Sequence, residues 1–471
     1  MTATVAEPDA SATATEPAAA GARPVPQRLV IVVPTTGAFD SRTFRIARAC
    51  IERGHAVTIL ARSGPGLPDE EVDPAGQRIV RVPVDPVDGL PGARLVRPVA
   101  ERWRRRAARG RTMTAAVPPA GESVGTDAEP LPTPRRGPLG RLRRAAAAGV
   151  RLAAIVLTVR AQLRASRLVD PGADLYHGMA YMGIPIASAL AARSGAAVVY
   201  DARDIYVDAG NVATLPGPVR RLVGRLERRW ARRADRVVTV NRPYAEVMAA
   251  RWDVPLPLIV MNCSFRYRPA EPRARRFHER LGLDPGTAVV LYQGGFSRER
   301  GIEQLVEAIC QVPDAVLVLM GYGALQAELE RIAADPATAG RVRILPAVPP
   351  AELLDWVAAA DIVAMPIQPT TLNHRLTTPN KLFEALAAGV PVIASDLPGM
   401  APTVRDSGAG VLVDPTDPAA IAAAIRDLLA DPAHRADLAH HALAAAHETY
   451  NWEAQAAILL AEYGRLTGKP W

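Results

Sequence analysis

The chain has 471 residues, of which 49% are hydrophobic and 22% are charged. Because one domain usually holds roughly 100–200 residues, this length predicts two or three domains with cores of their own. Three cysteines, Cys50, Cys263 and Cys310, lie far apart without a CxxC pair, which argues against a disulfide framework and a cysteine-based zinc site. The chain has no apolar run of about 18 residues and no signal-peptide pattern at its start, so we expect a cytoplasmic protein.

The basic residues outnumber the acidic ones by 56 to 48, for a net charge of +8. Nearly all of them are arginine, and the only lysines are Lys381 and Lys469. Together with the abundant alanine, proline and glycine, this is typical of a composition bias rather than of nucleic-acid binding. Aromatic residues make up 5% of the chain, too few for many base-stacking platforms. We therefore expect no nucleic-acid partner.

Residues 1–27 are rich in Ala, Pro, Thr and Glu without an apolar period, which predicts a disordered tail. The run LVIVVP that begins at Leu29 is typical of a buried parallel strand. A helical stretch over 42–55 and a second strand over 56–60 follow it and complete a βαβ unit.

The same alternation of strands and helices continues through the chain and restarts after a charged bridge at 266–286. It predicts an α/β protein with two Rossmann-like, doubly wound domains that face a central cleft. We expect an N-terminal domain over 28–265, a C-terminal domain over 266–445 and a final helical segment over 446–471. Further strands are expected at 79–84, 174–178, 197–202, 236–241, 258–262, 288–294, 315–321, 341–346, 361–366, 391–396 and 410–415.

Residues 107–140 are polar and rich in Pro and Gly, which predicts a mobile insertion in the N-terminal domain. The stretch 141–168 that follows has arginine-rich ends and an apolar middle. It is either an ordinary helix of the domain or a peripheral contact with the inner, anionic face of a membrane.

The segment 377–396, TTPNKLFEALAAGVPVIASD, concentrates polar side chains at the start of a predicted helix. Thr378 is expected to cap this helix, Pro379 to begin its first turn, and Gly389 to end it in a left-handed conformation.

Asn380, Lys381 and Glu384 share one face of that helix by their spacing. A lysine in the first turn is unfavourable next to the positive end of the helix dipole, unless an anion such as a phosphate binds there. Lys381 is either part of such an anion site or an exposed lysine in solvent.

Several segments resemble the donor half of the GT-B glycosyltransferases, specifically the large retaining family 4: 290–308, 318–323, 361–366 and 379–396. The N-terminal half is similar to the acceptor half of that family through 40–60, DLYHG, VVYDARDIY and ADRVVTVN. The resemblance implies transfer of a sugar from a nucleotide-sugar donor to a glycan, lipid or small-molecule acceptor. It also implies retention at the anomeric carbon and no need for a cofactor or metal.

The family pattern also implies roles for single residues. Glu384 takes the place of the Glu that holds the donor ribose, whereas Leu376 stands where the family has another Glu. Asn380, His374 and Arg375 are candidate substitutes for that missing carboxylate.

The family's basic pair near the diphosphate is only half present. Gly295 stands at the Arg position, and Arg300 stands at the Lys position before Gly301. Arg300 is expected to supply a fixed cation, with Lys381 in place of its missing partner, or else is a solvated charge in a turn that also holds Arg298.

Gly37, in the loop after the first strand, is expected to let the backbone approach phosphates, or else is a plain turn glycine. Arg203 stands where many relatives have His, and its role is unassigned. His177 either faces the cleft or is structural. Asp201, Asp204 and Asp208 lack metal-ligand spacing and are expected to cap helices or form salt bridges.

The final helix, 451–466, has one apolar stripe made by Trp452, Ala456, Leu459 and Tyr463. It either packs on its own domain or, as in GT-B relatives, crosses back to the first one. Two other functions compete with a retaining glycosyltransferase: a non-catalytic GT-B subunit, which the changes at Leu376 and Gly295 raise, and a nucleotide-sugar epimerase.

Overall fold

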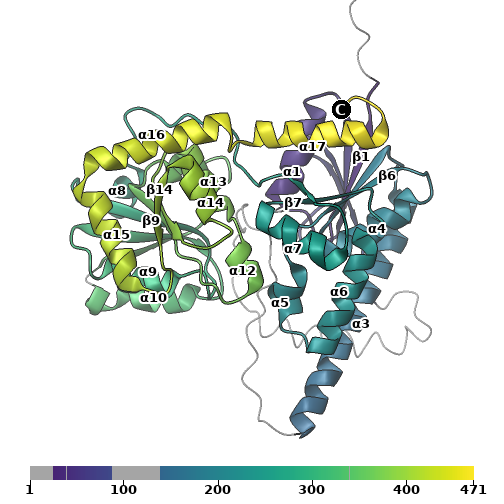
Figure 1. Cartoon of the computed structure of the whole chain (residues 1–471), viewed down its shortest axis with the longest axis horizontal. Coiled ribbons are helices and arrows are strands. Elements are labelled where there is room, and N and C mark those ends of the chain that lie inside the picture. Colours follow the sequence, from purple (N-terminus) through teal and green to yellow (C-terminus); the bar gives the residue numbers. More distant parts are fainter. Residues whose placement is uncertain (1–24, 39, 87–137, 339) are drawn as a thin grey trace, which may run out of the picture.

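A computed structural model describes residues 25–38, 40–86, 138–338 and 340–471 of the chain (Figure 1). Two α/β units stand side by side in this view, and the C-terminal helices α16 (Pro432–Glu448) and α17 (Trp452–Thr467) run across both. The predicted α/β class with two doubly wound sheets is therefore confirmed. We call the two units the N-terminal half and the C-terminal half.

The N-terminal half is built on an eight-stranded sheet of order β3-β4-β2-β1-β5-β6-β7-β8. All neighbouring pairs are parallel except β3–β4. The chain reverses its direction of growth between β1 and β5, which is the switch point where such sheets bind ligands. The strands are β1 (Arg28–Val32), β2 (Ala56–Arg62), β3 (Glu70–Val72), β4 (Arg78–Val82), β5 (Leu175–Met179), β6 (Ala197–Asp201), β7 (Arg236–Thr239) and β8 (Leu258–Ile259). The helices are α1 (Ser41–Ile51), α3 (Pro138–Val169), α4 (Ala180–Ala191), α5 (Gly210–Ala213), α6 (Gly217–Ala231) and α7 (Arg242–Trp252), with a 3-10 turn at Tyr206–Asp208.

The C-terminal half is built on a six-stranded, all-parallel sheet of order β11-β10-β9-β12-β13-β14, whose switch point lies between β9 and β12. The strands are β9 (Ala288–Gly295), β10 (Ala315–Tyr322), β11 (Val342–Leu345), β12 (Ile362–Met365), β13 (Val392–Ser395) and β14 (Gly410–Val413). The helices that precede α16 are α8 (Arg276–Leu281), α9 (Ile302–Ile309), α10 (Gln326–Ala334), α11 (Leu353–Val357), α12 (Leu372–Leu376), α13 (Asn380–Ala387), α14 (Ala401–Ser407) and α15 (Pro418–Ala430), with a 3-10 turn at Pro336–Thr338.

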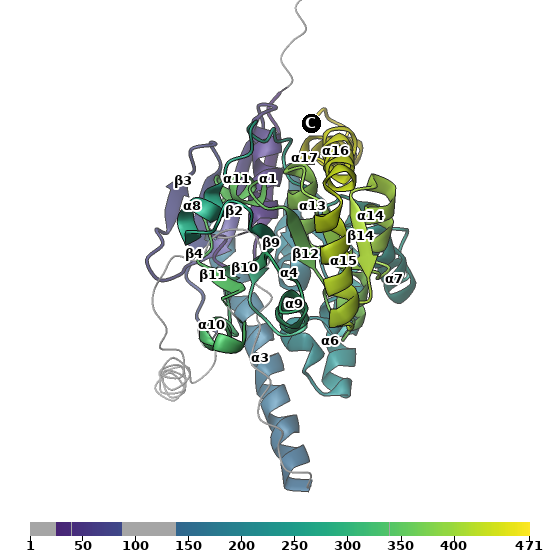
Figure 2. The ribbon, with the colours of Figure 1, turned by 90° about the vertical axis from the view of Figure 1, so that its left-hand side faces the viewer.

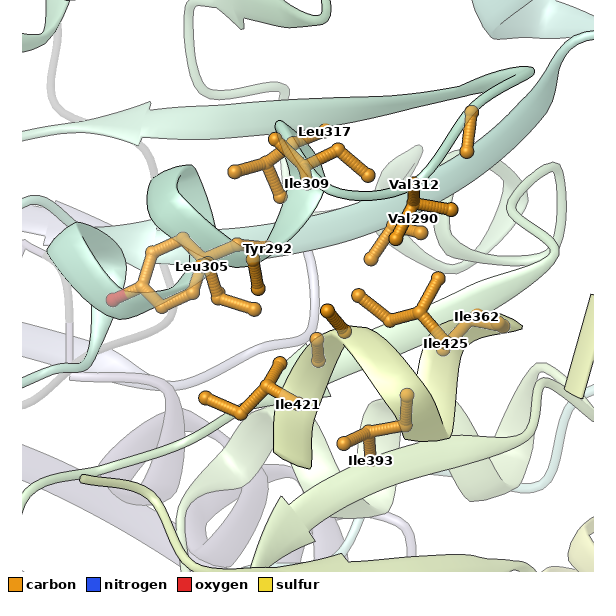
Figure 3. Packing of buried hydrophobic residues seen from close by; sticks show 14 of the residues in the cluster. Val290, Tyr292, Leu305, Ile309, Val312, Leu317, Ile362, Ile393, Ile421 and Ile425 are labelled. Atoms are coloured by element: carbon orange, nitrogen blue, oxygen red, sulfur yellow. The ribbon is translucent and has the colours of Figure 1, made fainter. Parts of the chain in front are cut away.

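Both faces of each sheet are covered, which is why the strands read as continuous apolar runs. Figure 3 shows one such layer of the C-terminal half, where α9 and α15 pack on β9, β10, β12 and β13. The opposite face carries a second core under α8, α11, α13 and α14. In the N-terminal half, α4, α6 and α7 cover one face, while α1 and α17 cover the other. The strands are thereby held rigidly, and their carboxyl ends present fixed loops.

Helix α17 belongs to the packing of the N-terminal half although it ends the chain. Its apolar stripe, Trp452, Ala456, Leu459 and Tyr463, is buried in one core with Leu29 of β1. The chain therefore crosses between the halves twice, near 262–266 and near 449–452, and the backbone N–H of Trp452 donates to the Ser264 carbonyl at 2.8 Å.

Helix α3 extends well past the other helices of the N-terminal half at its N-terminal end in both views (Figures 1 and 2). Among the described residues, no helix combines the length and the apolar character needed to cross a membrane. The predicted insertion, 107–140, falls outside the described residues except for 138–140, which begin α3. The predicted tail, 1–27, falls outside them except for 25–27, where Gln27 is buried.

Two details of the expected strands change. The sequence interpretation misses β3, a three-residue edge strand, and the strand expected at 258–262 is reduced to the two residues of β8. Edge strands this short carry too few apolar residues for a periodic signal.

Candidate functional site

A cavity of about 100 Å³ opens between the two halves, at the carboxyl ends of both sheets. We call it the interdomain cavity. The N-terminal half contributes Asp40, Ser41, Arg203, Asp204, Val240 and Asn262, and the C-terminal half contributes Arg300, Asn373, His374, Thr377, Thr378, Pro379 and Asn380. Ligand pockets usually hold roughly 300–1000 Å³, so the cavity in this structure is smaller than one that encloses a nucleotide-sized ligand.

On the N-terminal side, Arg203 and Asp40 form a fixed pair at the ends of β6 and β1. Asp40 caps α1 by accepting from the backbone N–H of Thr43 at 3.3 Å, and it accepts from Nη1 of Arg203 at 2.7 Å. Although burial opposes the charge, Asp40 raises the pKa of Arg203 above its ordinary value. The residue that replaces the expected His is thus a permanent cation held by a neighbouring carboxylate.

On the C-terminal side, Arg300 lines the cavity from the turn that leads into α9. Gly301, the next residue, has φ +78°, and a Cβ there would lie 2.0 Å from the carbonyl oxygen of Pro366. Only glycine fits this close approach, and it holds the turn against the end of β12. Burial, and then the nearby Arg300, lower the pKa of His374 to about 4, so this imidazole is neutral at pH 7.

Helix α13 carries the polar face expected from its sequence, but Thr378 does not cap it. The N-cap is Pro379, without a side-chain hydrogen bond. The Thr378 hydroxyl instead donates to the Gly399 carbonyl at 2.5 Å and accepts from Nδ2 of Asn241 at 2.9 Å. Contacts with neighbouring loops therefore outweigh the local capping preference, whereas the left-handed Gly389 is found as expected, with φ +65°.

Of the other polar residues of this face, Lys381 is buried, whereas Glu384 and Asn380 are half-buried. Lys381 is 3% exposed, with Nζ 3.8 Å from the centre of the Tyr292 ring. Glu384 accepts from Nε2 of Gln293 at 3.4 Å. Asn380 accepts from Nδ2 of Asn262 across the interdomain cavity.

Of the predicted site residues, the structure brings Arg300, Thr378 and Asn380 together at the interdomain cavity. Lys381, Glu384, Gly295 and Gly37 are not among the residues that line it. Gly295 ends β9, and its carbonyl accepts from the Tyr292 hydroxyl at 2.8 Å. Gly37 has φ +74° in the loop after β1. The roles expected for all seven stay predictions.

Three residues are candidates to substitute for the family carboxylate that Leu376 replaces: His374, Arg375 and Asn380. His374 and Asn380 line the interdomain cavity, whereas Arg375 is exposed and is not among the lining residues. Leu376 itself is buried and packs into the core of the N-terminal half.

Arg45 of α1 was not identified as a candidate site residue in the sequence analysis. It donates to the Cys263 carbonyl and to Oδ1 of Asn262, a cavity residue. Burial, and then Arg42, lower its pKa to about 10, while Glu384 of the opposite half acts against this shift. The available signal was the pair Arg42 and Arg45 in the first half of α1, because cations near a helix N-terminus are unfavourable without a partner.

Of the other candidates in the N-terminal half, Asp204 lines the interdomain cavity, whereas His177, Asp201 and Asp208 do not. His177 is fully buried between Oδ2 of Asp201, at 3.2 Å, and the Tyr463 hydroxyl, at 2.6 Å, so it does not face the cavity. Asp201 also accepts from Nε of Arg42 at 2.7 Å, and Asp208 pairs with Arg251 at 2.8 Å. Within the residues that the structure describes, no group of His, Cys, Asp and Glu side chains could hold a metal ion.

A larger cavity of about 660 Å³ lies at the amino ends of β9, β10 and β12, on the opposite edge of the C-terminal sheet. Two of its four arginines bind carbonyl oxygens at or after helix ends: Arg435 donates to Leu428 of α15 at 2.9 Å, and Arg426 donates to Gln311 at 3.2 Å. They neutralise the negative ends of helices, which is a structural role.

Residues 287–431 match the family model described as glycosyl transferases group 1. The D-inositol 3-phosphate glycosyltransferase of Xylanimonas cellulosilytica is 32% identical over 272 residues, which span 55% of this chain and 64% of that protein. The protein of the same name from Acidothermus cellulolyticus is 30% identical over 328 residues, which span 64% of this chain and 70% of that protein.

Solved structures agree on the fold. Sucrose-phosphate synthase from Thermosynechococcus elongatus superimposes with a TM-score of 0.67 at 22% identity, covering 94% of this chain and 99% of that one. HepE from Anabaena in complex with UDP-glucose superimposes with a TM-score of 0.59 at 16% identity, covering 93% and 100%. The chain therefore has the GT-B fold and belongs to the glycosyl transferases of group 1.

Proposed function

We propose that this protein is a retaining glycosyltransferase that moves a sugar from a nucleoside diphosphate sugar to a hydroxyl of an acceptor. The observation that carries the proposal is the interdomain cavity, where Arg300 and the α13 N-terminus of one sheet meet the Arg203–Asp40 pair of the other. Two fixed binding faces around one cavity suit a reaction between two substrates.

The C-terminal half would hold the donor. In the transfer, the bond between the sugar C1 and the diphosphate oxygen would break, a bond from C1 to the acceptor oxygen would form, and the acceptor hydroxyl would pass its proton to the departing diphosphate. Negative charge grows on the diphosphate as it leaves, and cations stabilise it best in a water-poor site. Arg300 and Lys381 would carry that charge, and Glu384 would accept hydrogen bonds from the ribose hydroxyls.

The N-terminal half would hold the acceptor, at the carboxyl ends of β1, β6 and β7. The relatives from Xylanimonas and Acidothermus are named for a phosphorylated cyclic polyol, D-inositol 3-phosphate. This supports a polar, hydroxyl-rich acceptor, and Arg203 would supply a fixed cation beside it.

Turnover with a panel of donors tests the proposal. UDP-glucose, UDP-N-acetylglucosamine and GDP-mannose are each incubated with the protein, with and without D-inositol 3-phosphate, and nucleoside diphosphate release is measured. We expect one donor to be turned over, in EDTA as well as in magnesium, because cationic side chains rather than a metal would neutralise the diphosphate. Binding of the donors without any turnover would favour a non-catalytic subunit, and a change of the sugar without its release would favour an epimerase.

The variant Arg300→Ala sharpens this test. Because charge develops mainly in the transition state, it should lower kcat by roughly 10²–10³-fold with a smaller change in the donor KM. Arg405→Ala, which removes an exposed arginine of α14 paired with Asp396, is the matched control. A wild-type kcat for Arg300→Ala would place the cation elsewhere.

We also propose that α3 attaches the enzyme to the inner, anionic face of a membrane, which implies a cytoplasmic location. The 32 residues of α3 include no acidic residue, and Val150 and Val156 are 60% and 41% exposed. Cosedimentation with phosphatidylglycerol vesicles, but not with phosphatidylcholine vesicles, is the expected result. Equal recovery in the supernatant with both lipids would contradict it.

A further inference from the structure

Helix α12 belongs to the C-terminal half by its place in the chain but packs into the N-terminal half. Leu376, at its end, is 8% exposed and joins the buried cluster under α4, α6 and α7, and Leu372 packs on the same cluster. In Figure 1, α12 lies on the inner side of the C-terminal half, towards α5 and α7. The two halves therefore share a hydrophobic core at this point.

The side chain of Asn373, on α12, forms hydrogen bonds with three groups of the N-terminal half. Its Oδ1 accepts from the Ile205 backbone N–H at 2.8 Å and from the Tyr244 hydroxyl at 2.7 Å. Its Nδ2 donates to Oδ1 of Asp204 at 3.1 Å. The side chain is 7% exposed, so these bonds have little competition from water.

The segment that follows α12 is fixed from two sides. Nδ2 of Asn241, in the N-terminal half, donates to the Leu376 carbonyl at 2.7 Å. On the other side, a Cβ at Gly399 would lie 2.3 Å from the carbonyl carbon of Leu376, so the backbones touch. This leaves α12 little freedom to shift while the halves are in contact.

His374 lies between these anchors and faces the interdomain cavity beside Arg300. Nδ1 of its ring is 2.8 Å from the Thr370 hydroxyl, which orients the imidazole. If Arg300 binds the diphosphate, then the neighbouring part of the cavity wall, which carries His374, lies beside the sugar, because the sugar C1 is joined to that diphosphate. A hydrogen-bonding imidazole at this wall suits a sugar hydroxyl.

We propose that Asn373 is a positioning residue: by fastening α12 to the N-terminal half, it holds His374 where the donor sugar binds. Recognition of the sugar then depends on contact between the halves, whereas recognition of the nucleotide depends on the C-terminal half alone. The proposal rests on the proposed function for its chemistry, while the anchoring itself does not.

Hydrogen exchange tests the anchoring without reference to activity. Asn373→Ala should speed amide exchange over residues 372–378 by about tenfold or more, because the three side-chain bonds are lost, while exchange in α15 stays unchanged. Tyr244→Phe, which removes one hydroxyl, should act in the same direction but less. Unchanged exchange over 372–378 in both variants would overturn the proposal.

Kinetics and calorimetry test the positioning. With the donor that the wild type turns over, Asn373→Ala should raise the donor KM by about tenfold, while the affinity for the corresponding nucleoside diphosphate stays within about twofold. Gln455→Ala is the matched control, because Gln455 is a 3% exposed amide that accepts from the Met261 N–H outside α12. It should change neither quantity.

A second pair of variants, N373D and N373D/D204N, covers the case in which Asn373→Ala does not fold. N373D alone places a carboxylate against Asp204 and should raise the donor KM, and N373D/D204N restores an amide–carboxylate pair and should lower it again. Faster exchange with an unchanged KM would overturn the positioning role and leave the proposed function standing. A wild type without turnover of any donor would overturn the proposed function, while the exchange result still decides the anchoring.

Discussion

Glu384 and Arg45 are opposite charges that approach each other from the two halves of the molecule. Glu384 lies on α13 and Arg45 on α1, and the Glu384 charge acts on the pKa of Arg45 against the effect of burial. A ligand that uses the Glu384 carboxylate therefore also changes the surroundings of a residue on the other half.

Replacing Glu384 by Gln removes the charge but keeps the shape. We expect the affinity for the nucleoside diphosphate to fall by about 1–3 kcal/mol, because hydrogen bonds to a carboxylate are stronger than those to an amide. Calorimetry checks this, with the exposed Glu448→Gln of α16 as the control. An affinity equal to that of the wild type would show that the ribose lies elsewhere.

Glu227 of α6 predicts a pH dependence of stability. Burial raises its pKa to about 7, although the Tyr200 hydroxyl, at 2.7 Å, and Arg251 oppose the shift. Between pH 4.5 and 7 the folded protein binds this proton and the unfolded chain does not, so stability falls as the pH rises. This residue alone should make the protein about 2 kcal/mol less stable at pH 8 than at pH 5.5.

Denaturant unfolding of the wild type and of Glu227→Gln at both pH values measures this effect. The other titrating groups are common to the two proteins, so the difference between their pH dependences isolates Glu227. Parallel pH dependences would mean that Glu227 is ionised in the folded protein.

Part of the site could be predicted from the sequence, residue by residue. Arg300 follows the carboxyl end of β9, and Thr378 and Asn380 lie at the start of α13, where the sequence concentrates polar side chains. The pairing of Arg203 with Asp40 was not predictable, because 163 positions separate the two residues and no local spacing encodes their contact. For the same reason, Leu376 was read as a lost carboxylate, whereas the fold uses it as a core residue.

At the scale of elements, the turn between β9 and α9 depends on Gly301. Gly282 of α8 provides a comparison: its φ is +62°, but no atom lies within 4 Å of an added Cβ. Gly282→Ala should cost about 1 kcal/mol for the left-handed backbone alone. Gly301→Ala should cost at least about 2 kcal/mol more, because the methyl group overlaps the Pro366 carbonyl.

Unfolding free energies of the two variants check this difference. Gly301→Ala should also weaken nucleoside diphosphate binding, since Arg300 sits in the displaced turn. Equal costs for both variants would show that the turn adapts and that its glycine is needed only for its backbone angle.

The strands were predictable as elements, and the short connecting helices were not. Each central strand is buried on both faces, so a continuous apolar run marks it. Helix α12 has five residues, too few for a period of 3.6 to show, and its contacts lie in the other half. Its importance could be recognised only once both halves were placed.

At the scale of the whole molecule, a buried polar chain joins α17 to the N-terminal sheet. The Tyr463 hydroxyl bonds Nδ1 of His177, and the His177 ring continues to Asp201 and Arg42. Tyr463→Phe leaves an imidazole nitrogen unsatisfied in the core and should cost about 1–3 kcal/mol of unfolding free energy.

Tyr450→Phe is the matched comparison, because it also removes a hydroxyl that forms a 2.6 Å hydrogen bond. Its partner, Asp406, is exposed and can bind water instead, so the cost should stay below about 1 kcal/mol. A larger loss for Tyr450→Phe than for Tyr463→Phe, measured by denaturant titration, would contradict the role given to the buried chain.

The double crossing of the chain limits how proteins with this fold can be recombined. Trp452 and Tyr463 complete the core on β1. A chimera that takes its C-terminal half from a relative must therefore take the residues from about 450 onwards from the same parent as its N-terminal half. The exchangeable cassette is therefore an internal segment, spliced near 265 and 449, and not everything downstream of the first splice. Chimeras spliced once should fold poorly. Chimeras spliced twice should keep the stability of the parent N-terminal half when the cassette also carries Leu372 and Leu376, which pack into that half.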